Sequence, residues 1–222
     1  MSKKNYNNTL YFLSRDLLRL CLNIVFDIKI HGVSNLPGAP YIAAANHTSY
    51  WDPPLIGYAC SKDSLDFMAK KELFDKPVLG IWMRAVNCIE VDRGASALKS
   101  MREAIRRVKN NRSIAIFPEG TRAKDGNFLE AKNGIGFIIS KAAVPVVPIY
   151  IESARKNKDK RRTGFLGRKQ INVYIGQAIQ PDELAVKSDN YSALAGLVME
   201  YIMTIKNKTK RETQVNAVGV KG

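Results

Sequence analysis

Apolar residues near the start of the chain recur at alternating steps of three and four positions, which places them on one face of a helix. They are Leu10, Leu13, Leu17, Leu20 and Ile24. The charged residues Arg15, Asp16 and Arg19 fall on another face. This pattern predicts an amphipathic helix from about Thr9 to Phe26.

After Tyr41 the pattern changes to short apolar runs separated by segments with helical spacing. The runs that we predict to be strands are 41–45, 65–68, 86–91, 113–117, 144–151 and 171–175. Helical spacing marks 98–108, 134–143 and 194–205. Because strands alternate with helices and are apolar on both faces, the sequence predicts an α/β fold with a largely parallel central sheet flanked by helices.

Polar clusters follow three of the predicted strands directly. They are Asn46-His47, Asp92-Arg93 and residues 118–122. In open α/β sheets, ligands bind at the carboxyl ends of the strands. We therefore expect these three clusters to converge on one edge of the sheet and to form a site there.

His47 lies five residues before Asp52, and Asp52 precedes Pro53-Pro54. A residue before proline is pushed out of the helical region and proline suits the first helical position, so we place Asp52 near a helix N-terminus. There its carboxylate stays ionised and accepts a hydrogen bond from one imidazole nitrogen, which leaves the other nitrogen free as a base. This pair is the base and the orienting acid of a catalytic triad without a protein nucleophile.

A lone histidine is more often a capping or packed residue than a catalytic one. For His47, the adjacent Asn46, the nearby Ser49 and Asp52, and the position at a strand end favour the base. The only other histidine, His31, has no carboxylate partner in its Lys-Ile-His-Gly-Val context. We interpret His31 as structural or exposed.

The segment Phe117-Pro118-Glu119-Gly120-Thr121-Arg122 predicts a tight turn, because proline and glycine favour one. Such a turn exposes backbone N–H groups and directs Arg122 outward, where its guanidinium suits a phosphate. Arg93 offers a second phosphate contact at the neighbouring strand end. Each arginine taken alone fits a surface ion pair equally well, with Asp92 or Glu119 as the local partner.

The composition of the chain limits the kinds of protein to which it can belong. The chain has 222 residues, 45% of them hydrophobic, which is enough for one domain with a full core. Lys and Arg exceed Asp and Glu by 35 to 20, which favours an anionic partner such as acidic lipid or nucleic acid. Cys21, Cys60 and Cys88 are far apart, so neither a disulfide framework nor a zinc site is expected, and a reducing compartment fits best.

Four segments together resemble the motifs of the glycerolipid acyltransferases, typified by 1-acylglycerol-3-phosphate acyltransferase. Residues 46–52 resemble the family's His-x4-Asp signature, 91–93 its second block, 117–122 its third and 144–149 its fourth. The four stand in the family's order across roughly residues 35 to 180. Asn87, Glu90 and Ala123 depart from the usual pattern, where glycine, an apolar residue and serine are common. These departures concern the choice of acceptor more than the chemistry.

The resemblance implies transfer of a fatty acyl group from an acyl thioester, either acyl-CoA or acyl carrier protein, to the free hydroxyl of 1-acylglycerol-3-phosphate (lysophosphatidate). The product is phosphatidic acid, in phospholipid biosynthesis. His47 takes the proton from the attacking hydroxyl and Asp52 orients His47. The acceptor and its phosphate are expected to contact Arg93, Glu119, Gly120, Thr121 and Arg122. The thioester donor is a co-substrate, and neither a bound cofactor nor a metal is expected.

Two alternatives stay open from the sequence. One keeps the chemistry but uses glycerol-3-phosphate or another lysophospholipid as acceptor. The other is a non-catalytic basic module that binds acidic lipid or nucleic acid. The absence of a P-loop, a Gly-x-Gly-x-x-Gly segment, zinc spacing and an aromatic-basic RNA motif argues against nucleic acid as a partner.

Because the expected product is a lipid, we expect the positive charge of the protein to bind an anionic membrane surface. A basic segment contains Arg155, Lys156, Lys158, Lys160, Arg161, Arg162, Arg168 and Lys169, with Phe165 and Leu166 available for insertion. The N-terminal helix either lies in the membrane interface or packs on the core, since both uses need an apolar stripe. No apolar run approaches the roughly 20 residues that span a bilayer, so we expect a peripheral protein on the cytoplasmic face.

These expectations divide the chain into three parts. Residues 1–35 form an amphipathic helical membrane-association segment, residues 36–207 form the acyltransferase domain, and residues 208–222 form a flexible tail.

Overall fold

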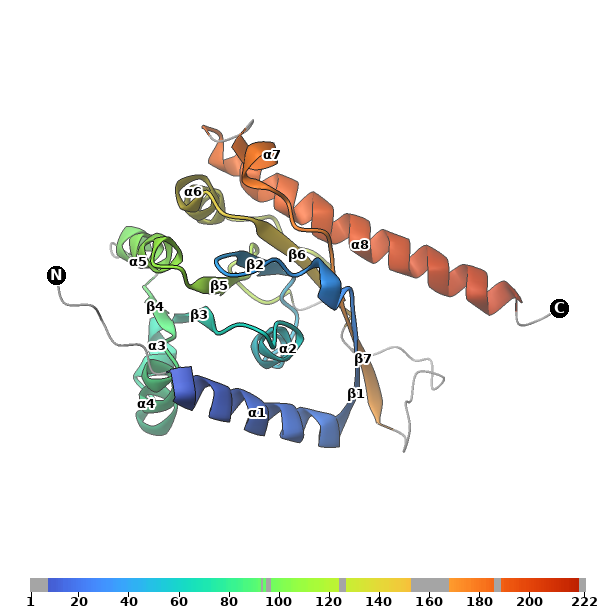
Figure 1. Ribbon diagram of the computed structural model, residues 1–222, viewed down its shortest axis with the longest axis horizontal. Coiled ribbons are helices and arrows are strands. Elements are labelled where there is room, and N and C mark those ends of the chain that lie inside the picture. Colours follow the sequence, from blue (N-terminus) through green and yellow to red (C-terminus); the bar gives the residue numbers. More distant parts are fainter. Residues whose placement is uncertain are drawn as a thin grey trace.

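A computed structural model describes residues 8–92, 94, 97–123, 127–152, 168–185 and 189–219 of the chain (Figure 1). The elements in chain order are α1 Asn8–Val25, β1 Phe26–His31, the short 3₁₀ helix η1 Val33–Asn35, β2 Ile42–Ala45, α2 Asp52–Ala59, β3 Leu65–Lys70, α3 Lys71–Phe74, α4 Pro77–Ala85, β4 Ile89–Val91, α5 Ala97–Lys109, β5 Ser113–Ile116, α6 Asn133–Ala142, β6 Val146–Glu152, β7 Lys169–Ile175, α7 Pro181–Ala185 and α8 Tyr191–Gly219.

The strands form one seven-stranded sheet in the order β1-β7-β6-β2-β5-β3-β4. Strands β2 to β6 run parallel to one another, whereas β7 is antiparallel to β6 and carries β1 parallel to itself. The predicted α/β fold with a largely parallel sheet is confirmed. Because β2 lies in the middle of the sheet, the residue that follows it stands at the centre of the carboxyl edge.

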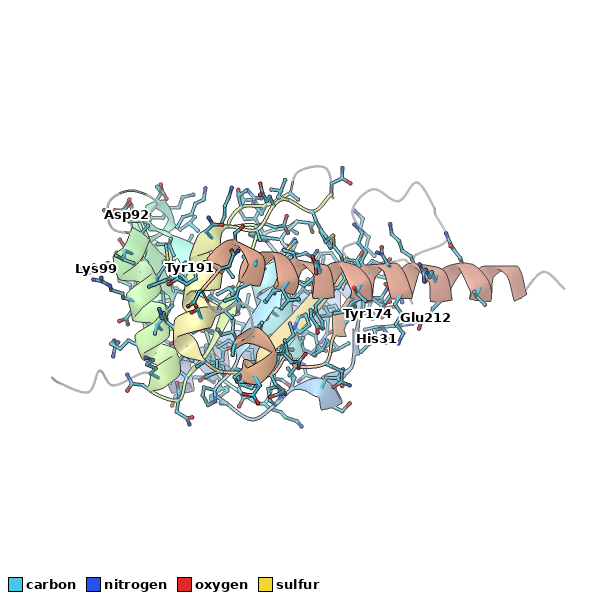
Figure 2. The ribbon with its side chains drawn as sticks, turned by 90° about the horizontal axis from the view of Figure 1, so that it is seen from above. His31, Asp92, Lys99, Tyr174, Tyr191 and Glu212 are labelled. Carbon is cyan, nitrogen blue, oxygen red and sulfur yellow. The ribbon has the colours of Figure 1, made fainter. Side chains whose placement is uncertain are left out.

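Helices cover both faces of the sheet (Figure 1). Helices α5, α6 and α8 pack on one face, against Ile42 and Ala44 of β2 among others. Helices α1 and α2 pack on the other face, against Ala43 and Ala45. Figure 2 shows the long α8 lying lengthwise across its face of the molecule. Successive side chains of β2 point to opposite faces of the sheet, and all four are buried. The core therefore has two layers, one on each face of the sheet.

The secondary structure differs from the prediction near both ends of the chain. The segment 1–35 was expected to be helical, but it also contains β1, in which Phe26, Ile28 and Ile30 pack on the core. The last helix was expected to end near Ile205 and to give way to a flexible tail, yet α8 continues to Gly219. No proline or glycine interrupts the chain between Ile205 and Gly219, so nothing in the backbone chemistry stops the helix there. The division into three functional parts stays a prediction.

A buried ionic cluster fixes α5 against the sheet. Asp66 of β3 is fully buried and accepts hydrogen bonds from Arg107 and Arg112. Glu103 bonds Arg106 and Arg107 one helical turn away, and these bonds, the one to Arg106 foremost, lower the pKa of its carboxyl to about 2. Buried charges are tolerated when each one is paired in this way.

The apolar stripe of α1 faces away from the core. Its outward residues Leu13, Leu17, Leu20 and Ile24 are each at least 60% exposed, whereas Tyr11 and Leu22 on the opposite face are buried. The helix therefore packs on the core through the face opposite these four residues, and it presents their apolar side chains to the outside.

Helix α4 extends the apolar surface beside α1. The Trp82 Nε1 group donates a hydrogen bond to the Ser14 hydroxyl at 3.1 Å, which joins the two helices, and Val78 and Ile81 are strongly exposed. We call the exposed residues Leu13, Leu17, Leu20, Ile24, Val78 and Ile81 the apolar surface. Among the residues that the structure describes, no helix is both long enough and apolar enough to cross a bilayer.

Candidate active site

Asn46 fixes the end of β2, where the chain leaves the sheet. Its buried side-chain amide donates to the Ile151 carbonyl at 3.1 Å and accepts from the Ile151 N–H at 2.7 Å. This pair of bonds to β6 replaces the ladder bonds that a further strand residue would make. The next residue, His47, is thereby placed at the carboxyl edge of the sheet.

The predicted pair of His47 and Asp52 is present. The His47 Nδ1 atom lies 2.9 Å from Asp52 Oδ2, and Asp52 is fully buried as the first residue of α2. The same oxygen accepts the N–H groups of Thr48 at 2.6 Å and Ser49 at 2.7 Å. These donors and the positive end of α2 favour the ionised carboxylate.

An ionised carboxylate only accepts hydrogen bonds, so Nδ1 of His47 carries the proton in this pair. The lone pair then resides on Nε2. Within the described part of the chain no group bonds Nε2, and the imidazole is partly exposed. The geometry therefore supplies an oriented base at the strand end.

The imidazole is held on its face and through its backbone. The ring of Phe117, which follows β5, stacks on it at 4.0 Å between centroids with an interplanar angle of 20°. The Ala123 N–H donates to the His47 carbonyl at 2.8 Å, and the His47 N–H donates to Glu119 at 2.8 Å. The loop 46–52 and the segment 117–123 therefore form one unit.

Glu119 acts as a buried clamp between loops. Its side chain is fully buried, with one oxygen accepting the His47 N–H and the other the Leu129 N–H at 2.9 Å. Burial raises the pKa of this carboxyl, and the two N–H groups oppose the rise. An enclosed carboxylate does not fit the expected direct contact with a phosphate, which it would also repel. In this structure Glu119 shapes the site through the backbone of His47.

The predicted tight turn is present after Phe117. The Gly120 N–H donates to the Phe117 carbonyl at 2.9 Å across Pro118, and Gly120 has φ 61°, a conformation that favours glycine. Thr121 is exposed at the surface of the turn. Arg122 follows, and its guanidinium carbon lies 3.5 Å from the ring centroid of Tyr50, in the loop that carries His47. The turn thus brings Arg122 to the same loop as the base.

The third polar cluster lies farther along the same edge. Asp92 follows β4, which is the edge strand and stands three places from β2 in the sheet. Its carboxylate accepts the Gly94 N–H at 3.0 Å and lies 3.6 Å from Lys71 Nζ, and the bond to Gly94 is the main cause of its lowered pKa. Arg93 lies outside the described residues, so its predicted phosphate contact stays a prediction.

Three contributions were not predicted from the sequence. The stacking of Phe117 on His47 and of Tyr50 on Arg122 depends on loop geometry that spacing does not encode. Lys206 of α8 lies 4.2 Å from the ring centroid of Phe128, and burial lowers the pKa of its ammonium group while nearby Glu119 opposes the change. Lys206 lies where the last helix was expected to end, and nothing in the sequence around it indicated a contact with this site.

His31 is found at the surface, in agreement with its interpretation as a structural or exposed residue. It is exposed, stacks on Tyr174 at 4.6 Å between centroids (Figure 2), and lies 3.4 Å from the Asn172 side-chain oxygen. Among the described residues, its contacts join the edge strand β1 to its neighbour β7 and involve no carboxylate.

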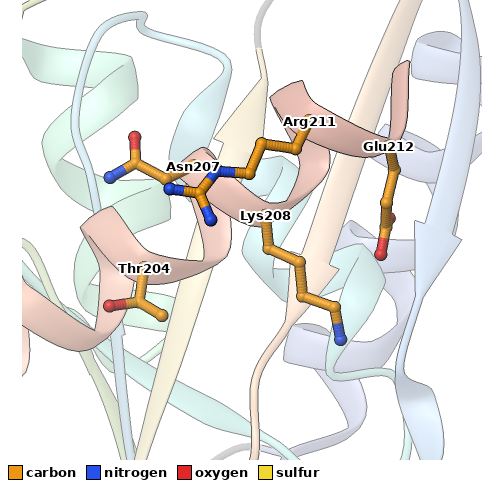
Figure 3. Close-up of a pocket in the computed structure, with 5 residues that line it drawn as sticks. All are labelled: Thr204, Asn207, Lys208, Arg211 and Glu212. Atoms are coloured by element: carbon orange, nitrogen blue, oxygen red, sulfur yellow. The ribbon is translucent and has the colours of Figure 1, made fainter. Parts of the chain in front are cut away.

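Two surface hollows occur away from His47. One of about 350 Å³ runs along α8 and is bordered by Thr204, Asn207, Lys208, Arg211 and Glu212, which all come from that helix (Figure 3). The other, of about 830 Å³, is bordered largely by α3, β4 and α5 and includes the ionic groups around Glu103. Across the described ranges, no three His, Cys, Asp or Glu side chains gather as a metal site.

Comparison with known proteins places this geometry in a family. The family model described as Acyltransferase matches residues 27–152, more than half of the chain, and this span contains the His47–Asp52 pair and the turn before Arg122. The chain belongs to the Acyltransferase family. It is therefore an acyltransferase, and the resemblance inferred from its four motifs is confirmed.

Similar proteins share most of the length of the chain. A 1-acyl-sn-glycerol-3-phosphate acyltransferase of Streptococcus pneumoniae is 28% identical over 92% of this chain and 72% of its own. One of Bacillus subtilis is 23% identical over 90% and 98%. The crystal structure of PlsC, the 1-acyl-sn-glycerophosphate (LPA) acyltransferase of Thermotoga maritima, matches with a TM-score of 0.70 and 27% identity, over 88% of this chain and 79% of that one. The likeness thus extends over most of the chain and not over the motifs alone.

Replacing Glu119 by glutamine tests the clamp. The amide of glutamine has one oxygen, so one of the buried N–H groups of His47 and Leu129 loses its acceptor and meets an NH₂ group. We expect the free energy of unfolding to fall by about 1–3 kcal/mol, measured by urea denaturation. The matched control Glu130→Gln changes an exposed carboxylate nearby and should stay within about 0.5 kcal/mol of the parent. Equal stabilities for both variants would contradict the clamp.

Proposed function

We propose that this acyltransferase moves a fatty acyl group from an acyl thioester to the free hydroxyl of 1-acylglycerol-3-phosphate and so forms phosphatidic acid. The observation that carries the proposal is the oriented imidazole of His47, with Nε2 open and with Arg122 held over the same loop. The named activities of the similar proteins from Streptococcus pneumoniae, Bacillus subtilis and Thermotoga maritima support it.

In the proposed reaction the acceptor hydroxyl attacks the thioester carbonyl while Nε2 of His47 takes its proton. A C–O bond forms, and the tetrahedral intermediate then collapses with cleavage of the C–S bond. The imidazolium returns its proton to the departing thiolate, which leaves as a free thiol. Asp52 stabilises the imidazolium and keeps Nδ1 engaged throughout.

Direct transfer needs no acyl-enzyme, and the cysteines nearest the core fit this scheme. Burial raises the pKa of the Cys60 and Cys88 thiols to about 12, so both are protonated at neutral pH. A protonated, buried thiol is a poor nucleophile. The acceptor alcohol is therefore the attacking group in the proposed mechanism.

The acceptor's phosphate is proposed to bind at the turn that follows Phe117. Arg122 supplies a guanidinium fork, and Gly120 and Thr121 are exposed beside it in the turn. Arg93 is proposed as a second cation from the neighbouring strand end. Acyl-CoA and acyl carrier protein are both proposed donors, since each presents the same thioester.

We propose that the enzyme works as a peripheral protein on the anionic, cytoplasmic leaflet of a membrane. Both the acceptor and the product are lipids, the apolar surface on α1 and α4 faces outward, and the chain carries a net charge of +15. An amphipathic helix with such an exposed stripe partitions into the interface without spanning it. Most of the basic segment 155–169 lies outside the described residues, so its part in this binding stays a prediction.

Replacing His47 by alanine tests the proposed base. Removal of a general base lowers the turnover number by about 10²–10⁴-fold, measured as thiol release from acyl-CoA with 1-acylglycerol-3-phosphate as acceptor. The control His31→Ala removes the other histidine and should leave thiol release unchanged. The same assay with glycerol-3-phosphate, other lysophospholipids and acyl carrier protein as donor shows which substrates are used.

Unchanged turnover in the His47 variant would contradict the mechanism. Thiol release with glycerol-3-phosphate but not with 1-acylglycerol-3-phosphate would contradict the proposed acceptor and leave the chemistry intact. A protein that releases no thiol with any acceptor, yet binds nucleic acid in a salt-sensitive way, would contradict the proposed function as a whole.

Replacing Leu13, Leu17 and Leu20 together by serine tests the apolar surface. Each of these side chains is exposed, so the fold should tolerate the change. Because each loses apolar area that would leave water, we expect binding to vesicles with anionic phospholipid to weaken by at least about tenfold in a sedimentation assay. Leu98→Ser on α5 changes an exposed leucine elsewhere and should have no effect. Equal sedimentation of the triple variant and the parent would contradict membrane docking through α1.

A further inference from the structure

Tyr50 and Arg122 form a stack at the surface of the site. The guanidinium carbon lies 3.5 Å from the ring centroid, which is a close face contact. Tyr50 is 73% exposed, so its ring fills no place in the core. Among the described residues, neither side chain makes a hydrogen bond or an ion pair with another group. The stack is therefore the contact that positions Arg122.

A stack of this kind leaves the anion-binding part of arginine available. The aromatic face attracts the cation, while the five N–H donors point outward in the guanidinium plane. A phosphate binds through these in-plane donors and so does not compete with the ring for the same surface. The tyrosine also holds a long side chain that would otherwise lose conformational entropy on binding.

Tyr50 connects Arg122 to the loop that carries His47. Tyr50 lies between His47 and Asp52, in the loop that carries the base. The stack therefore adds a side-chain link between this loop and Arg122, beside the backbone bonds that His47 makes to Glu119 and Ala123. A phosphate bound by Arg122 is thereby kept at a fixed distance from Nε2 of the base.

We propose that Tyr50 is a positioning residue for the acceptor's phosphate, which it recruits by holding Arg122 flat against its ring. This inference rests on the proposed function, since it concerns the same acceptor. An aromatic residue at position 50 then increases the preference of the enzyme for phosphorylated over unphosphorylated acceptors. The hydroxyl group of Tyr50 has no part in the stack, so phenylalanine serves equally well.

The neighbouring Trp51 shows that exposure alone does not create this role. Trp51 is 43% exposed, but its ring packs edge-on against Phe26 of β1, at 5.7 Å between centroids. It therefore contacts a different element and not Arg122. This makes Trp51 a matched control, because its replacement also removes an exposed aromatic ring from the same loop.

The test compares Tyr50→Leu, Tyr50→Phe and Trp51→Leu in full-length protein, by thiol release with 1-acylglycerol-3-phosphate and with monoacylglycerol, the acceptor without phosphate. Loss of an exposed cation–π contact predicts that Tyr50→Leu raises KM for the phosphorylated acceptor about 2- to 5-fold with kcat nearly unchanged. Its kinetics with monoacylglycerol should not change. Tyr50→Phe should match the parent, and Trp51→Leu should leave the ratio of the two acceptors unchanged.

A second comparison asks whether Tyr50 acts through Arg122. In an Arg122→Gln background, Tyr50→Leu should have no additional effect on KM, because the cation of the stack is already absent. An active Tyr50→Leu enzyme with the parent's KM, or the same loss in both backgrounds, would overturn the inference. A parent protein that releases no thiol with any acceptor would contradict the proposed function itself, so the two failures are distinct.

Discussion

One carboxylate oxygen, Oδ2 of Asp52, determines the arrangement of the site. It accepts the imidazole N–H of His47 and the backbone N–H groups of Thr48 and Ser49, from a fully buried position at the start of α2. The backbone bonds fold the loop back on the helix, and the third bond turns the imidazole so that Nε2 is left open. A change in the charge of this oxygen therefore affects loop shape, ring orientation and proton affinity together.

Further contacts fix the loop 46–52 against β6 and against the segment 117–123, which forms the second part of the site. Asn46 pins the loop to β6, and Glu119 joins the His47 backbone to Leu129 from a buried position. Phe117 and Ala123 complete the unit. Buried polar groups whose bonds are satisfied make a unique and rigid geometry. A rigid frame favours a reaction between two bound substrates, because correct orientation supplies a large part of the rate enhancement.

The sequence predicted the parts of the molecule whose signals are local. Alternating apolar runs gave the α/β class, the prolines after Asp52 placed it at a helix start, and Pro118 with Gly120 gave the turn. What the sequence did not predict depends on contacts between distant segments. The strand β1 pairs with β7 across more than a hundred residues, and the burial of Glu119 and the stacking of Tyr50 follow from how two loops meet.

The orientation of the base is tested most directly by the protonation of the two ring nitrogens of His47, measured by ¹⁵N nuclear magnetic resonance on the neutral side chain. The chain has two histidines, so a His31→Asn variant assigns the signals. We expect a protonated Nδ1, held by Asp52, and an unprotonated Nε2 that is ready to accept the proton of the acceptor hydroxyl. A neutral ring protonated on Nε2, with Nδ1 bare, would contradict this orientation.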